Sequence, residues 1–146
     1  MGPSSNDRIG GAVLQVQKLA VVGLGLLGGS VALAARARGV AAQIIAIDPR
    51  GKDLSPAVRE GVVNSYTSDL ARGLADADLV LLAGPVETIR LQLPGVLGAV
   101  APGAIVTDVG STKRVLVEEA AQHDRHRNFV GSHPMVGGHH TGWQHA

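Results

Sequence analysis

The sequence predicts an α/β fold in which a doubly wound, mainly parallel sheet lies between two layers of helices. Three observations predict it: short apolar runs alternate with helical segments, the runs have almost no polar interruption, and glycine or proline turns separate them. Parallel strands are buried on both faces and joined by crossover helices, so they give this pattern. A core can form, because 45% of the 146 residues are hydrophobic and 17% are charged.

Four of the six strands are expected where three to five apolar residues follow one another, because a strand covered on both faces has no polar side. The first run follows Lys18, and the fifth follows the Pro102-Gly103 turn. The six expected strands are residues 19–22, 44–47, 62–66, 79–83, 104–107 and 128–130.

The segments between these strands have helical composition. Gly39 suits the end of the first helix, and Ser55 with Pro56 suits the cap and first turn of the second. Pro94 is expected to interrupt or bend the third helix, because proline lacks a backbone N–H. The four expected helices are residues 27–38, 55–60, 87–100 and 115–123.

The composition argues against several classes of partner and site. Net charge is +1, which gives no basic surface for nucleic acid. The chain has no cysteine, which excludes disulfides, thiolate metal sites and cysteine nucleophiles and fits a cytoplasmic protein. Residues 19–35 carry no charge and resemble a signal peptide or membrane helix, but four glycines within them argue against both, and no membrane partner is expected.

The segment from Gly23 to Gly28 reads Gly-Leu-Gly-Leu-Leu-Gly and matches the G-x-G-x-x-G pattern. It follows a strand, opens a helix and has Asp48 twenty residues later, which is the context of a Rossmann dinucleotide site. Gly23 would permit the tight turn, Gly25 the close approach of the pyrophosphate, and Gly28 the packing of helix on strand. The alternative is a glycine-rich turn without a ligand. We expect the cofactor to contact Gly23, Gly25, Leu26, Leu27, Gly28, Asp48, Arg50, Gly84, Pro85, Asp108 and Gly110.

Asp48 favours NAD over NADP. Its carboxylate would accept hydrogen bonds from the adenine ribose hydroxyls and would repel a 2′-phosphate. Arg50 argues in the opposite direction, because an arginine beside the ribose can accommodate that phosphate.

Two further motifs follow the fifth and sixth expected strands. The first, residues 108–113, reads Asp-Val-Gly-Ser-Thr-Lys, and the second, residues 131–137, reads Gly-Ser-His-Pro-Met-Val-Gly. Carboxyl ends of parallel strands are where open α/β sheets bind ligands. With the glycine fingerprint before them, these motifs make the chain resemble the prephenate and arogenate dehydrogenase family, over about residues 18–142.

The resemblance implies an NAD-dependent oxidative decarboxylation in tyrosine biosynthesis, with prephenate or arogenate as the small-molecule substrate. His133 matches the family histidine that takes the proton of the substrate hydroxyl, and imidazole suits that task near neutral pH. Ser111 would orient the histidine or the hydroxyl, Pro134 would stiffen the turn, and Ser132 and Lys113 would assist substrate binding. The alternatives are a structural histidine, a serine that only caps a helix, and a solvated lysine.

The chain also departs from the family. It has Gly138, His139 and His140 where relatives commonly carry an acidic residue, and Gly84 where they often have a hydroxyl. Residues 1–17 carry Gly, Pro, Ser and Asn without a sustained period and are expected to form a flexible arm. The resemblance implies a dinucleotide-binding catalytic domain over residues 18–146 and a helical C-terminal dimerisation domain that is missing. We therefore expect a fragment of a longer homodimeric enzyme. Other Rossmann dehydrogenases, a non-catalytic NAD-binding module and a histidine metal site at residues 133, 139, 140 and 145 remain alternatives; we expect no metal.

Overall fold

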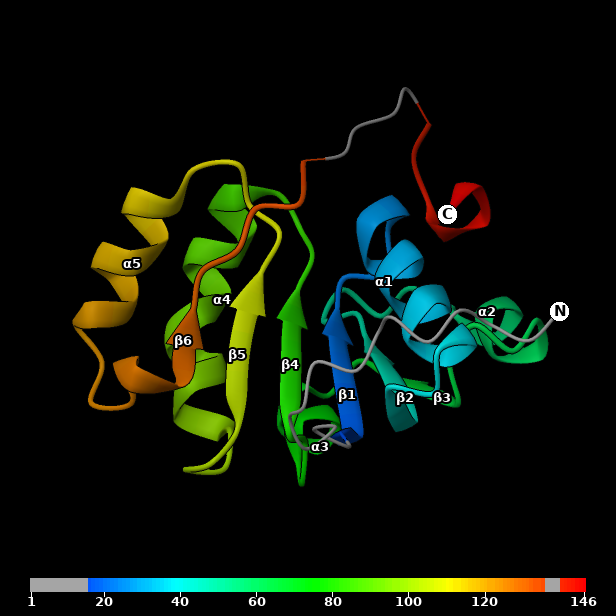
Figure 1. Cartoon of the computed structure of the whole chain (residues 1–146), viewed down its shortest axis with the longest axis horizontal. Coiled ribbons are helices and arrows are strands. Elements are labelled where there is room, and N and C mark those ends of the chain that lie inside the picture. The colour runs from blue at the N-terminus through cyan, green and yellow to red at the C-terminus, as the bar shows by residue number, and fades with distance from the viewer. Residues whose placement is uncertain (1–15, 136–139) are drawn as a thin grey trace, which may run out of the picture.

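The computed structural model describes residues 16–135 and 140–146, and it shows a six-stranded parallel sheet between helices (Figure 1). The strand order is β3-β2-β1-β4-β5-β6. The strands are β1 (Val16–Val22), β2 (Ala41–Ile47), β3 (Ser65–Thr67), β4 (Leu79–Leu82), β5 (Ile105–Asp108) and β6 (Phe129–Val130). The helices are α1 (Leu26–Ala37), α2 (Ser55–Arg59), α3 (Leu70–Leu74), α4 (Val86–Ala99) and α5 (Lys113–Ala121), with short 3-10 turns η1 (His126–Asn128) and η2 (Trp143–His145).

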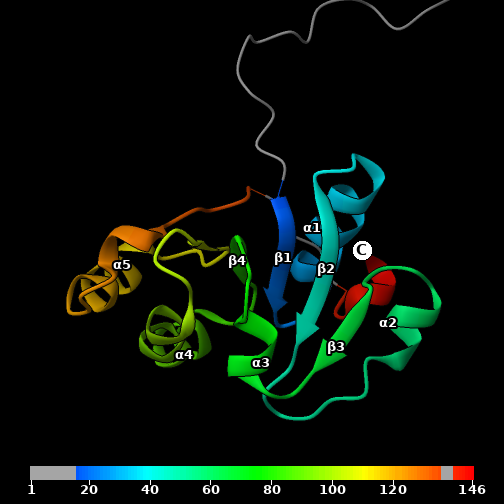
Figure 2. The same ribbon diagram turned by 90° about the horizontal axis from the view of Figure 1, so that it is seen from below.

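Successive residues of β1 enter two different cores, which explains why its sequence is apolar without alternation. Leu19 and Val21 belong to the core that includes α1, α2 and Trp143. Ala20 and Val22 belong to the core that includes α3, α4 and α5. Figure 2 shows these two groups of helices on opposite sides of the sheet. The predicted three-layer, doubly wound α/β fold is therefore confirmed.

The strand order reverses between β1 and β4. The chain runs outward from β1 through β2 to β3, and then returns to place β4, β5 and β6 on the other side. Loops after β1 and β4 consequently lead to opposite faces of the sheet and leave a crevice between them. All six strands are parallel, so every loop after a strand lies at this edge, as the arrows of β1, β4, β5 and β6 show in Figure 1.

Several predicted boundaries differ in the structure. β1 begins at Val16, inside the arm that was expected to end at residue 17; residues 1–15 lie outside the described ranges. Ser55 is the first residue of α2 and Leu54 occupies its cap position, so the assignment of Ser55 as the cap was wrong. The carboxylate of Asp53 instead accepts hydrogen bonds from the backbone N–H and the hydroxyl of Ser55.

Pro94 lies inside α4, which continues through it as one helix of 14 residues. Proline removes one helical hydrogen bond, but α4 also buries Ile89, Leu93, Val96 and Leu97 against the sheet. This burial of large apolar side chains outweighs the loss of one bond. The expected interruption at Pro94 is therefore absent.

Three short elements, α3, η1 and η2, were not expected from the sequence. Asp69 caps α3 by accepting the backbone N–H of Arg72, at 3.0 Å. Gly73 lets α3 approach β2, because a Cβ there would lie 2.4 Å from the Ile47 side chain. At the end of the described chain, η2 packs against α1, and its Trp143 is buried.

The uncharged run of residues 19–35 is divided between β1, the glycine turn and α1. Within the described ranges, no helix has the length and apolar character needed to cross a membrane.

Candidate functional site

A continuous cleft follows the carboxyl edge of the sheet, at the crevice where the strand order reverses. It consists of three adjoining cavities of about 470, 360 and 130 Å³. All three share Gly84 and Pro85, in the loop after β4. Asp48 lines the cleft at one end and His133 at the other. Residues that the sequence places 85 positions apart thus face one elongated cavity.

The three fingerprint glycines have different surroundings. Gly23 turns the chain out of β1 with φ +91°, a conformation that favours glycine. A Cβ on Gly28 would lie 2.3 Å from the carbonyl oxygen of Gly23, so only glycine lets α1 pack this closely. A Cβ on Gly25 would meet no protein atom within 4 Å and would stand in the cleft. Gly25 leaves room for a ligand, whereas Gly28 leaves room for the protein itself.

Asp48 directly follows the carboxyl end of β2, and the residue is 4% exposed. Burial alone would raise the pKa of Asp48, but hydrogen bonds from the side chain and backbone of Arg50 outweigh it. With the charges of Arg50 and Lys52, they hold the pKa of Asp48 below its ordinary value of 3.8. Asp48 is therefore an anion at neutral pH, with Arg50 as its ion-pair partner at 3.3 Å. An anion in this position can accept hydrogen bonds from ribose hydroxyls.

The end of the cleft near Asp48 contains residues that the sequence analysis did not identify. Thr88 and Gln92 come from the first turns of α4, and Pro49 follows Asp48. Lys52 lines the adjoining cavity, where it adds a second positive charge to that of Arg50. The four-residue spacing of Thr88 and Gln92 on a helix that starts beside the cleft was the available sequence signal.

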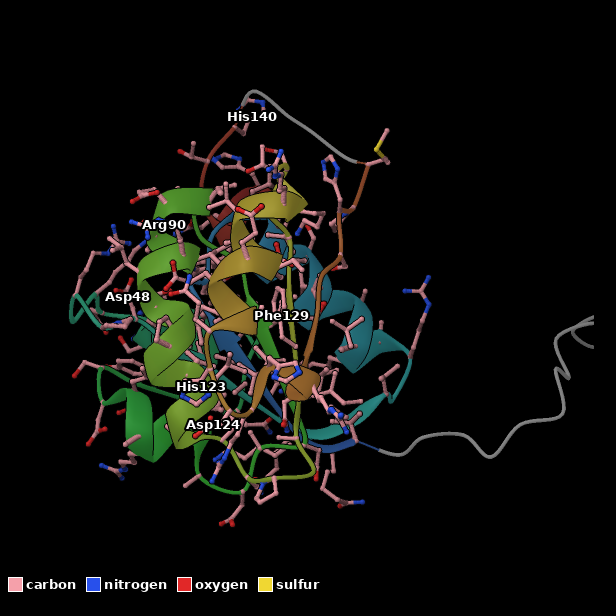
Figure 3. All side chains as sticks on the ribbon, turned by 90° about the vertical axis from the view of Figure 1, so that its left-hand side faces the viewer. Asp48, Arg90, His123, Asp124, Phe129 and His140 are labelled. Carbon is pink, nitrogen blue, oxygen red and sulfur yellow. The ribbon has the colours of Figure 1, made fainter. Side chains whose placement is uncertain are left out.

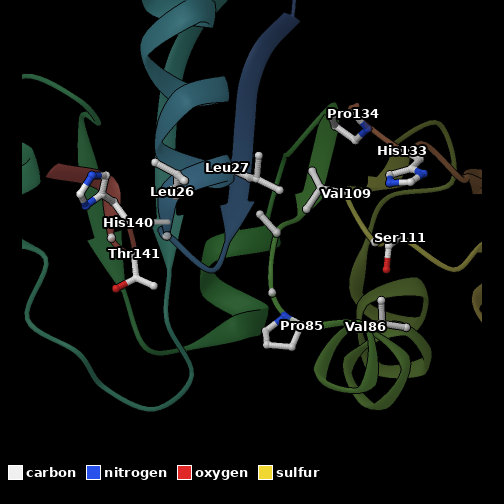
Figure 4. Close-up of a pocket in the computed structure, with 15 residues that line it drawn as sticks. Leu26, Leu27, Pro85, Val86, Val109, Ser111, His133, Pro134, His140 and Thr141 are labelled. Atoms are coloured by element: carbon white, nitrogen blue, oxygen red, sulfur yellow. The ribbon is translucent and has the colours of Figure 1, made fainter. Parts of the chain in front are cut away.

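The other end of the cleft carries the side chains proposed for chemistry. His133 and Pro134 follow β6, and Ser111 follows β5; Figure 4 shows them on one side of the cavity. Across it lie Leu26 and Thr141. No hydrogen bond joins the described side chains of His133 and Ser111. Thr112 occupies the cap position of α5, so Ser111 is not the helix cap that was the alternative interpretation.

Asp108 and Gly28 were expected to contact the cofactor, but neither lines the cleft. Asp108 is 0% exposed, and its carboxylate binds Lys113 and the backbone N–H of Gly110 and of Ser132. The Ser132 hydroxyl donates to the carbonyl of Asp108. Lys113 and Ser132, which were expected to bind substrate, thus bind Asp108 and do not line the cleft. The other predicted residues (Gly23, Gly25, Leu26, Leu27, Asp48, Arg50, Gly84, Pro85, Gly110, Ser111 and His133) all line it.

Residues 140–146 form a wall of the cleft that the sequence analysis missed. Thr141, Gly142 and Gln144 line the middle cavity together with Gly23 and Gly25. This placement depends on the chain folding back onto α1, for which the local sequence carries no signal. Residues 136–139, including Val136 and Gly137 of the second motif and His139, lie outside the described ranges.

Besides His133, the part of the chain that the structure describes contains His123, His126, His140 and His145. His123 and His126 lie on the η1 side of α5 and bond to backbone groups; Figure 3 shows His123 and Asp124 far from His140. The rings of His140 and His145 stack at 4.9 Å. Within residues 16–135 and 140–146, no group of three or more His, Asp or Glu side chains has an arrangement that could hold a metal ion.

Comparison with known proteins agrees with this geometry. Residues 31–146 match a family described as "Prephenate dehydrogenase, nucleotide-binding domain". The prephenate dehydrogenase of Bacillus subtilis (strain 168) is 36% identical over 124 residues, which are 84% of this chain and 33% of that protein. The chain thus spans about a third of the length of this curated relative.

Solved structures give the same result. The prephenate dehydrogenase of Aquifex aeolicus, in complex with hydroxyphenyl propionate and NAD+, superimposes with a TM-score of 0.79 at 30% identity, over 88% of this chain and 45% of that one. The arogenate dehydrogenase of Synechocystis gives a TM-score of 0.79 at 34% identity, over 89% of this chain and 45% of that one.

Proposed function

The chain belongs to the prephenate dehydrogenase family as its nucleotide-binding domain, and we propose that it works in the NAD-dependent oxidative decarboxylation of prephenate to 4-hydroxyphenylpyruvate. The observation that carries the proposal is the cleft itself. It has a buried carboxylate, Asp48, at one end and an imidazole, His133, at the other, with the glycine turn between them.

The residues of the cleft fit a dinucleotide. The open space at Gly25 and the N-terminus of α1 suit the pyrophosphate, because free backbone N–H groups and the helix dipole favour anions there. Asp48 would accept the hydrogen bonds of the adenine ribose. Thr88 and Gln92 would lie beside the adenine. We propose NAD as the cofactor, since the carboxylate of Asp48 disfavours a 2′-phosphate.

The catalytic roles follow from the positions of His133 and Ser111. A bound nicotinamide would supply the acceptor for the hydride that leaves the hydroxyl-bearing ring carbon. His133 would accept the hydroxyl proton, while loss of carbon dioxide from the opposite ring carbon leaves the ring aromatic. Ser111 and His133 share no direct hydrogen bond, so a substrate hydroxyl between them would bond to both.

Arogenate is a second candidate substrate, and the 34% identity to the Synechocystis arogenate dehydrogenase favours its inclusion. The two substrates differ in the side chain opposite the hydroxyl, and this domain's motifs face the hydroxyl.

We propose that the domain boundary lies near residue 16 and that a further dimer-forming domain completes the enzyme.

The test is a turnover assay of the natural full-length protein with NAD or NADP and with prephenate or arogenate. We expect NADH formation with NAD, and an excess of kcat/KM for NAD over NADP. If NAD binds but neither substrate is oxidised, the protein is a non-catalytic binding module and the proposed reaction is wrong.

A further inference from the structure

Asp108 connects the two loops that carry the proposed reaction residues. It is the last residue of β5, between the loop that contains Ser111 and the segment after β6 that contains His133. Its Oδ2 accepts the backbone N–H of Gly110 at 2.7 Å, and its Oδ1 accepts the backbone N–H of Ser132 at 3.1 Å. Gly110 directly precedes Ser111, and Ser132 directly precedes His133. One buried carboxylate therefore holds both loops.

Ser132 is held by further contacts with the end of β5. Its hydroxyl donates to the carbonyl of Asp108 and lies 3.2 Å from the hydroxyl of Thr107. Thr107 in turn donates to the carbonyl of Val130 at 2.7 Å. Ser132, the residue just before His133, is consequently bonded to two successive residues of β5, Thr107 and Asp108. β6 itself has only two residues, so these side-chain bonds extend a very short strand pairing.

Lys113 supplies the charge that makes this arrangement stable. Its ammonium pairs with Oδ2 of Asp108 from the first residue of α5, and its side chain is 30% exposed. A buried carboxylate without a partner would be strongly destabilising. The positive charge of Lys113 is thus directed at Asp108, and neither residue lines the cleft.

We propose that Asp108, with Lys113 as its counter-ion, is a positioning residue that fixes His133 relative to Ser111. This inference rests on the proposed function, in which both side chains must reach one substrate hydroxyl. Proton transfer requires hydrogen-bond distance, and a displacement of about 1 Å can lower a rate about 100-fold. Asp108 acts through the backbone of Ser132 and Gly110 and touches no ligand.

The experiment compares Asp108→Asn with the natural full-length protein. The amide of asparagine has one oxygen, so it can accept one of the two backbone N–H groups and not both in this geometry. We expect hydrogen exchange of the Ser132 or Gly110 amide to accelerate at least about 10-fold, because one of them loses its acceptor. We expect kcat to fall about 10- to 100-fold, as for other residues that orient a reacting group, with NAD affinity changed less than about 3-fold.

Asp78→Asn is the matched control. The carboxylate of Asp78 also accepts two backbone N–H groups, those of Gln17 at 2.8 Å and Lys18 at 2.9 Å, at the amino end of β4. Both bonds fall on one oxygen, Oδ2, so the single oxygen of asparagine can accept both, whereas the two bonds of Asp108 fall on different oxygens. Asp78→Asn should leave kcat and the hydrogen exchange of the Ser132 amide unchanged. Because Asp108→Asn leaves Lys113 without its anion, the double variant Asp108→Asn with Lys113→Met removes both charges. It should fold and show the same loss of kcat.

The possible outcomes separate this inference from the proposed function. Unchanged amide exchange and kcat in both Asp108 variants would overturn it, and so would a loss of NAD affinity as large as the loss of kcat. If the natural protein oxidises neither substrate, the proposed function fails. Faster exchange at Ser132 in Asp108→Asn would then still support the structural link between the two loops.

Discussion

Trp143 lies directly against Gly29, so that a Cβ on Gly29 would be 2.6 Å from the Cβ of Trp143 and 2.9 Å from its Cα. Gly29 is outside the three-glycine pattern, and its lack of a side chain serves the packing of residues 140–146 on α1. Those residues also form a wall of the cleft through Thr141 and Gln144. A contact within the core thus shapes the binding site.

The first prediction concerns Gly29→Ala. The added methyl group meets backbone as well as side chain, so residues 140–146 must move. We expect a loss of about 1–3 kcal/mol in the free energy of unfolding, as for other overpacked positions. NAD affinity should fall several-fold. Thermal unfolding and calorimetric NAD titration measure the two effects. Gly103→Ala is the suitable control, because a Cβ there would meet no atom within 4 Å. Gly39 is a poor control because its φ is positive.

The second prediction uses Trp143 as a reporter, since it is the single tryptophan of the sequence. It is buried, and its neighbours Gly142 and Gln144 line the cleft. We expect its fluorescence to change saturably on addition of NAD, and to transfer energy to bound NADH. Emission that stays constant up to a concentration at which calorimetry shows saturation would contradict the proposed position of the cofactor.

The third prediction compares Gly25→Val with Gly103→Val. A Cβ at Gly25 meets no protein atom within 4 Å and stands in the cleft, so the protein should fold with at most a small decrease in Tm and lose NAD affinity about 100-fold or more. Gly103→Val also adds a side chain in open space, away from the cleft, and should bind NAD normally. Equal NAD affinity in the two variants would exclude this cleft as the dinucleotide site.

The fourth prediction concerns Asp48 and pH. Asp48→Asn removes a charged acceptor, and a hydrogen bond to a charged group contributes about 1.5–3 kcal/mol, so NAD affinity should fall about 10- to 100-fold. Because the pKa of Asp48 is held below 3.8, the carboxylate remains ionised from neutral pH down to about that value. Its contribution to NAD binding should therefore be constant at neutral pH.

The same depressed pKa has a consequence for stability. The contribution of Asp48 to the free energy of unfolding is fully present above 3.8 and is lost as pH falls through its lower pKa in the folded protein. Asp48→Asn should thus flatten the acid end of the stability curve. Urea unfolding at a series of pH values measures it; identical curves for the two proteins would mean that the ion pair with Arg50 has no effect on folding.

The fifth prediction concerns His133→Asn in the natural full-length protein. Removing a general base lowers turnover by about 10²- to 10⁴-fold. NAD affinity should change little, because His133 lies at the other end of the cleft from Asp48. The dependence of kcat/KM on deprotonation of a base should disappear as well. A variant that keeps the full rate and the same pH profile would show that His133 is not the base.

The strands and most of the cleft were predictable because they depend on local patterns. Continuous apolar runs identified β1, β4 and β5, and the glycine pattern with Asp48 identified one end of the cleft. These features follow from the chemistry of neighbouring residues in the sequence. Boundaries were less certain, as the early start of β1 at Val16 shows, because pairing with Ala41 of β2 extends the strand beyond its apolar part.

Other features depend on contacts between distant residues and gave no local signal. Asp108 stands in a motif, which suggested direct contact with a ligand, but its carboxylate is turned to Gly110 and Ser132. The wall formed by Thr141 and Gln144 exists because Trp143 packs on α1. Pro94 suggested a break that the apolar face of α4 overrides.

The fold-back of residues 140–146 also sets an order of events during synthesis. The glycine turn emerges from the ribosome more than a hundred residues before Gln144, which lines the same cleft. A nascent chain that lacks residues 140–146 therefore lacks one wall of the binding groove. The coenzyme would be captured at full strength after the late segment has docked, and would thereby stabilise the finished domain in preference to its incomplete precursors.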